Sequence, residues 1–126
     1  MNNNLKNKKI TFLGVTFKPN TDDMREASSL KMIPYFSRKG ALIRYFDPSG
    51  NKHILDKIKN VKFSKNISEA CLKSDLIILH TEWNEFKLLN FKKLVKKNNF
   101  KIYDMRNIYS PKKMKISNIK YFSIGR

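Results

Sequence analysis

Residues 9–15, with the sequence KITFLGV, decide how this chain folds. A short, continuous apolar run that is rich in Ile, Val and Phe suits a strand buried on both faces of a sheet. Gly14 stands where a dinucleotide fold turns from its first strand into a helix, but Val15, Thr16 and Phe17 stand where such turns place further glycines. The stretch therefore predicts a buried strand and a turn whose backbone does not closely approach a pyrophosphate.

Strand and helix patterns alternate along the rest of the chain. Further strands are expected at residues 41–46, 61–63, 74–81, 100–105 and 120–125, and helices at 28–40, 68–73 and within 82–99. Ser28 or Ser29 should cap the first helix and Ser68 the second, while Pro34 should bend the first helix or delay its start. Strands separated by helices imply a doubly wound, Rossmann-like α/β fold, with a mainly parallel sheet of about six strands and helices on both faces.

Length and composition fit a single domain. The chain has 126 residues without a linker or repeat, so we expect one domain over residues 8–126 and a frayed terminus at residues 1–7. The longest apolar runs are too short to span a membrane, and the polar start lacks the apolar segment of a signal peptide. We therefore expect a soluble, cytoplasmic protein. Cys71 is the only cysteine, and we expect it to be an inert, half-buried thiol.

The net charge of +17 raises the possibility of nucleic-acid binding. However, 22 of the 27 basic residues are Lys and five are Arg, and the lysines are spread along the chain rather than gathered in one basic tract. Base readout favours the bidentate fork of Arg. Lys, Asn and Ile are all abundant and all have codons built from A and T, so an AT-rich genome explains the composition. A basic nucleic-acid-binding domain stays a remote alternative.

Polar residues gather in the loops that follow the expected strands, at 14–25, 47–48, 81–85 and 104–107. In doubly wound folds, ligands bind beyond the carboxyl ends of the strands, near the point where the strand order reverses. Lys18, Arg25 and Arg106 could reach a phosphate held in this region. Arg25 could instead pair with a neighbouring acid, and Arg106 with Asp104.

Other polar and aromatic residues of these loops are interpreted as structural. Asp22 and Asp23 precede the first helix and are expected to cap its free N–H groups. A metal site is not expected here, because no third oxygen or His ligand lies nearby in the sequence. His80 is expected to be a hydrogen-bonded histidine of the core rather than a proton shuttle. Trp83 and Phe86, one helical turn apart, are expected to pack in the core rather than to stack on a base.

Five blocks of sequence, FLGVTFKPNTDDMREASSLKMI, YFDP, TEWNEF, DMRNIY and SIGR, occur in register between residues 9 and 126. Together they resemble the C-terminal, UDP-binding domain of the UDP-glucose/GDP-mannose dehydrogenase family, and more closely its UDP-glucose branch. The resemblance implies a three-part enzyme, with an N-terminal domain that holds NAD, a connecting helical region that helps form a dimer, and a C-terminal domain that binds the UDP end. It places the catalytic cysteine outside the part matched here. Two NAD-dependent oxidations would convert the sugar's primary alcohol to a carboxylate, from UDP-glucose to UDP-glucuronate.

The resemblance also implies roles for individual residues. Lys18 matches a lysine that contacts the nucleotide sugar, Arg106 matches an arginine near that substrate, and Arg25 matches an arginine that reaches NAD on the other domain. No catalytic residue and no metal ligand is matched, and Cys71 is not the nucleophile. The ligands implied are UDP-glucose or a related nucleotide sugar, with NAD bound mainly by the N-terminal domain.

The match covers only the last part of such an enzyme. Three histories fit: a split subunit that works with a separately encoded N-terminal half, an inactive gene fragment, or an excised domain. A stand-alone module that binds nucleotide sugars is a further alternative. In each case we expect the chain alone to lack the NAD domain and the catalytic cysteine.

Overall fold

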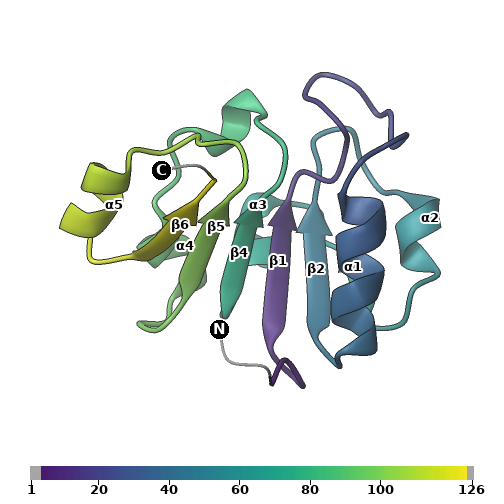
Figure 1. Cartoon of the computed structure of the whole chain (residues 1–126), viewed down its shortest axis with the longest axis horizontal. Helices are drawn as coiled ribbons and strands as arrows, with labels where there is room; N and C mark the ends of the chain where they lie inside the picture. The colour runs from purple at the N-terminus through teal and green to yellow at the C-terminus, as the bar shows by residue number, and fades with distance from the viewer. Residues whose placement is uncertain (1–3, 125–126) are drawn as a thin grey trace.

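A computed structural model describes residues 4–124, which form one six-stranded parallel sheet (Figure 1). The strand order is β3-β2-β1-β4-β5-β6, and every neighbouring pair is parallel. The strands are β1 (Lys9–Leu13), β2 (Leu42–Phe46), β3 (Val61–Phe63), β4 (Leu76–Leu79), β5 (Lys101–Asp104) and β6 (Lys120–Ser123). The predicted doubly wound fold is confirmed.

Helices cover the sheet on two sides (Figure 1). They are α1 (Ser29–Arg38), α2 (His53–Asp56), α3 (Ile67–Cys71), α4 (Phe91–Val95) and α5 (Pro111–Ile116). Alternate side chains of a strand point to opposite faces, so Phe12 packs with Ile33 of α1 and Leu55 of α2, whereas Leu13 packs with Val95 of α4 and Met114 of α5. The sheet therefore has a separate core on each face.

The helix predicted within residues 82–99 is wrong as one element. A short 3₁₀ helix, η1 (Asn84–Phe86), and α4 take its place, with Leu88 almost fully exposed between them at 97%. Asn90 has an extended backbone, and its side chain accepts the Lys93 N–H, so it starts a new helix. Lys96 then ends α4 in the left-handed conformation. The apolar residues of this segment do recur at helical spacing, but the cap at Asn90 divides the segment into two separate helices.

Several predicted caps are also wrong. Asn66, two residues before Ser68, caps α3 by accepting the Glu69 N–H at 2.7 Å. Ser28 precedes α1 without a side-chain cap, and the Asp23 side chain accepts the N–H of Arg25, in the loop before α1. Two short helices, α2 and α5, were not predicted. Pro34 lies inside α1, which starts at Ser29 all the same.

The predicted terminal fraying stays a prediction. Residues 1–3 lie outside the described residues, as do residues 125–126 of the SIGR block. Within the described part, the Asn7 N–H donates to the Gly40 carbonyl at 3.0 Å. Gly40 has φ +89° and follows the end of α1, as predicted for a glycine after a helix.

Two predictions about buried side chains can be compared with the structure. Trp83 and Phe86 are buried in the core, as predicted. Cys71 is completely buried rather than half-buried, and burial raises the pKa of its thiol to about 12. Because the thiolate is the reactive form, Cys71 is unsuited to act as a nucleophile.

Candidate functional site

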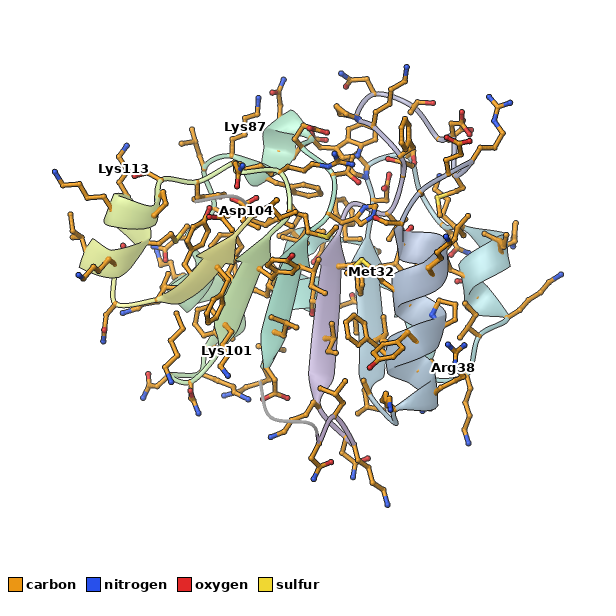
Figure 2. All side chains as sticks on the ribbon, in the orientation of Figure 1. Met32, Arg38, Lys87, Lys101, Asp104 and Lys113 are labelled. Atoms are coloured by element: carbon orange, nitrogen blue, oxygen red, sulfur yellow. The ribbon has the colours of Figure 1, made fainter. Side chains whose placement is uncertain are left out.

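The strand order reverses between β1 and β4, the two central strands of the sheet. The adjacent carboxyl ends of parallel strands form the usual ligand crevice at such a point. The loop of residues 14–28, which joins β1 to α1, lies at this edge and is called the β1 loop below. Figure 2 shows Asp104 at the same edge, where β5 ends, and Lys101 at the opposite end of that strand.

Gly14 is required by packing inside the protein. Its φ of +80° is a conformation that side chains with a Cβ rarely adopt. A Cβ at this position would lie 2.5 Å from the Thr81 Cβ and 2.8 Å from the Thr81 Oγ1. The glycine therefore lets the end of β1 approach the residues that follow β4.

Asp47 follows β2 and is buried under the β1 loop. Its Oδ2 accepts the backbone N–H of Val15 at 2.8 Å and, at the longer distance of 3.4 Å, that of Thr16. Its Oδ1 accepts both the N–H and the hydroxyl of Ser49, at 2.9 and 2.6 Å. The predicted turn is confirmed by the bond from the Gly50 N–H to the Asp47 carbonyl, but the role of the carboxylate was missed.

His80 follows β4 and is buried on the other side of the β1 loop. Its Nε2 accepts the Ser29 N–H at 3.1 Å and lies 2.9 Å from the Ser28 hydroxyl. A backbone N–H can only donate, so Nε2 carries no proton in this arrangement. The hydrogen of the neutral ring is then on Nδ1, 3.0 Å from the Thr81 Oγ1.

The environment favours this neutral form. Burial, together with the nearby charge of Arg106, lowers the pKa of His80 to about 4, while Asp47 acts in the opposite direction. Thr81 continues the chain of bonds, because its hydroxyl donates to the Thr16 carbonyl at 2.8 Å. The predicted hydrogen-bonded core histidine is confirmed.

Arg106 connects three segments at the reversal point. Its Nε donates to the His80 carbonyl at 3.0 Å, and its Nη2 donates to the Phe17 carbonyl at 3.2 Å. From Arg106, the Asp104 side chain accepts the backbone N–H, at 3.1 Å, and no ion pair joins these two side chains within the described residues. The side-chain pair considered for Asp104 and Arg106 is therefore wrong.

Lys18 follows directly after the carbonyl that Arg106 binds. Its side chain is exposed, and its own carbonyl accepts the Thr16 hydroxyl at 3.0 Å. The bond from Arg106 to the Phe17 carbonyl places the Lys18 backbone beside Arg106 at the carboxyl edge of β1 and β4. The two residues are 88 positions apart, so the sequence alone does not show that they are neighbours.

Arg25 lies in the same loop but faces a different partner. Its guanidinium donates to both oxygens of Asp23, with an ion-pair distance of 3.0 Å, and the Arg25 side chain is 89% exposed. These hydrogen bonds lower the pKa of the Asp23 carboxyl to about 2. The Asp23 carbonyl accepts the Phe17 N–H, so the pair is attached to the segment that carries Lys18.

The chemistry available at this edge is the binding of anions by side chains. Within residues 4–124, no group of three or more His, Cys, Asp or Glu side chains could hold a metal ion. Exposed cations at this edge include Lys18, Arg25 and Arg106, carried by two loops. No helix in the same range is long and apolar enough to cross a membrane.

Residues 11–111 match the model of the UDP-glucose/GDP-mannose dehydrogenase family, UDP binding domain. The chain belongs to this family. Among its curated relatives, a UDP-glucose 6-dehydrogenase of Rhizobium meliloti (strain 1021) is 35% identical over 125 residues, which cover 97% of this chain and 28% of that protein. The UDP-glucose 6-dehydrogenase YwqF of Bacillus subtilis (strain 168) is 36% identical over 125 residues, covering 94% and 28%.

Solved structures of dehydrogenases share the fold. The NDP-N-acetyl-D-galactosaminuronic acid dehydrogenase of Methanosarcina mazei Go1 aligns with a TM-score of 0.84 and 26% identity over 98% of this chain and 26% of that chain. A UDP-glucose dehydrogenase of Pyrobaculum islandicum aligns with a TM-score of 0.75 and 21% identity, over 94% and 26%. This chain thus corresponds to the UDP-binding domain of the family and spans about 28% of the length of the curated relatives named above.

Proposed function

We propose that this domain binds UDP-glucose or a related nucleotide sugar, and that Lys18 and Arg106 hold its phosphates. The domain would supply the substrate side of a cleft in an NAD-dependent nucleotide-sugar dehydrogenase. The observation that carries the proposal is the fixed β1 loop, which holds an exposed lysine beside the arginine that follows β5. Both cations lie where a doubly wound sheet binds its ligands.

The geometry of Arg106 supports this role. Two of its nitrogens bind backbone carbonyls, so the guanidinium is held in place before a ligand arrives. Among the described residues, no acceptor is bonded to its Nη1. A preorganised guanidinium loses less side-chain entropy on binding an anion, and its planar fork suits phosphate oxygens.

The cofactor requires residues beyond this domain. The β1 loop does not fit a dinucleotide, because the first backbone donors after β1 are bonded to Asp47. Arg25, exposed at the edge, is proposed to contact NAD that is held mainly by another domain, in the same polypeptide or in a separate subunit. NAD would supply the hydride acceptor. Because Cys71 is buried, the catalytic cysteine is also expected to come from that other domain.

Calorimetric titration with UDP-glucose tests the proposal, with GDP-mannose and NAD as comparison ligands. Lys18→Ala is expected to weaken UDP-glucose binding about 10- to 100-fold, since a hydrogen bond to a charged group contributes about 1.5–3 kcal/mol. Lys59→Ala is the matched control: Lys59 is exposed, and it lies just before β3 at the opposite edge of the sheet. It removes the same charge and should leave the affinity unchanged.

Arg106→Lys separates charge from geometry. It keeps one positive charge but loses the fork that binds the His80 and Phe17 carbonyls, so affinity for UDP-glucose should fall about 10-fold or more. If Lys18→Ala and Lys59→Ala lose the same affinity for UDP-glucose, the binding reflects only general electrostatic attraction. That result would overturn the assignment of Lys18 to the phosphates. A wild-type chain that unfolds cooperatively but binds no UDP-glucose would contradict binding by the domain alone.

A further inference from the structure

The β1 loop contains backbone groups that a dinucleotide fold offers to its ligand. In such folds, N–H groups of the turn after the first strand and of the following helix N-terminus bind the pyrophosphate. An acid after the second strand binds the ribose. In this chain, the corresponding acid, Asp47, and the turn donors, Val15 and Thr16, are bonded to each other.

The start of α1 is occupied in a similar way. The Ser29 N–H, the first of the helix, donates to the Nε2 of His80 at 3.1 Å. The next two N–H groups, of Leu30 and Lys31, donate to the carbonyls of Ala27 and Ser28 at 3.1 and 3.0 Å. The first three donors of the helix therefore already have acceptors within the chain.

The acceptors come from the two strands on either side of β1. Asp47 follows β2 and His80 follows β4, so the sheet order places one acceptor on each side of the β1 loop. Both side chains are buried. The loop carbonyls are also bonded: the Ser29 hydroxyl donates to the Val15 carbonyl at 2.5 Å, and the Thr81 hydroxyl to that of Thr16.

We propose that Asp47 and His80 seal the turn after β1 against phosphate and so determine which ligand groups the domain accepts. A phosphate at this turn would face the Asp47 carboxylate and would find the first N–H groups of the turn and of α1 already bonded. Phosphates must therefore be bound by side-chain cations farther out. This inference does not depend on UDP-glucose binding, because it concerns groups that a nucleotide sugar need not touch.

Amide NMR with inorganic phosphate as the probe tests the seal. In the wild-type chain, phosphate should leave the amide resonances of Val15 and Thr16 unchanged. The variant Asp47→Ala frees both N–H groups and opens space beside them. Phosphate should then shift the same resonances in a saturable way, and its affinity at these amides should be at least about 10-fold higher than in the wild type.

Two variants act as matched controls. Asp47→Asn removes the same charge but fills the space and can still accept an N–H, so phosphate should not shift the Val15 and Thr16 amides. Asp104→Ala removes another buried carboxylate from the same edge and should also leave them unmoved. Equal shifts in Asp47→Ala and Asp47→Asn would show that charge alone is responsible and would overturn the proposal.

Hydrogen exchange of the wild-type chain keeps the proposal testable if Asp47→Ala does not fold. The amides of Val15 and Ser29 should exchange at least about 100-fold more slowly than those of exposed loop residues, because their acceptors are buried. Exchange at the rate of exposed loops would mean that the donors are open in solution. That result would contradict a sealed turn, whether or not the chain binds UDP-glucose.

Discussion

Asp47 and Asp104 are both buried, both stand at the carboxyl end of a strand, and both accept backbone N–H groups. They differ in where those N–H groups lie. Asp104 accepts the N–H groups of residues two and five positions later, within its own loop, and also the Tyr121 hydroxyl of β6. Asp47 accepts the N–H of Ser49 in its own turn and also those of Val15 and Thr16, 32 and 31 positions earlier, and thus joins two crossovers. Similar carboxylates can therefore serve a local turn or the assembly of the whole edge.

Alanine substitution of either aspartate should have the largest effect on stability. Asp47→Ala leaves the N–H groups of Val15, Thr16 and Ser49 without their acceptor, and Asp104→Ala those of Arg106 and Tyr109, so each should lower the free energy of unfolding by about 3 kcal/mol or more. Urea denaturation measures the loss. Hydrogen exchange then tests the comparison: Asp47→Ala should expose the amides of Val15 and Thr16, and Asp104→Ala that of Tyr109. If each variant exposed the amides of both loops to exchange, the two aspartates would not differ in the segments that they hold.

Acid should weaken the His80 side of the same loop. The histidine pKa is about 6.5 in unfolded chains and about 4 here, so folding favours the neutral ring. The resulting stability is fully present above pH 6.5 and is lost as the pH falls towards 4, by about 3 kcal/mol in total.

Urea denaturation at pH 7, 5.5 and 4 measures this loss. His80→Gln is the control, because it removes the titrating ring while His53, the other histidine, remains. Its stability should change less between pH 6.5 and 4 than that of the wild type. The same pH dependence in both proteins would assign the loss to other groups.

The exposed pair of Asp23 and Arg25 should have the smallest effect. Their contact is well aligned, but solvent screens exposed ion pairs, so Arg25→Ala should leave the free energy of unfolding nearly unchanged. Thermal unfolding at low and high salt measures the change. A loss as large as that of Asp47→Ala would mean that the β1 loop depends on a surface contact as much as on the buried Asp47.

The fold followed from the sequence because apolar strands and intervening helices repeat in a pattern with few solutions. Features with local signals were also accessible, such as the turn at Asp47 and the glycine after α1. The helix α5 had such a signal in Ser110 and Pro111, since its N-cap serine accepts the Lys113 N–H and proline occupies the first helical position, but it was overlooked.

Other features depend on partners that are distant in sequence. Nothing near Asp47 indicates that its acceptor groups meet Val15, and nothing near Arg106 indicates that it binds the Phe17 carbonyl. The region 82–99 failed for a different reason. Its helical spacing extends across Asn90, whose extended backbone and capping side chain interrupt it. Periodicity reports which residues are buried and does not report where a backbone turns.

The central position of β1 has a consequence for how the protein is made. Of the six strands of this sheet, β1 is the first to leave the ribosome, yet its neighbours are β2 and β4, and β4 ends at Leu79. One edge of β1 therefore has no partner strand until the ribosome has added the residues up to Leu79. The histidine that holds the start of α1 is the very next residue after that strand. Translation past this point is what allows the ligand edge to form.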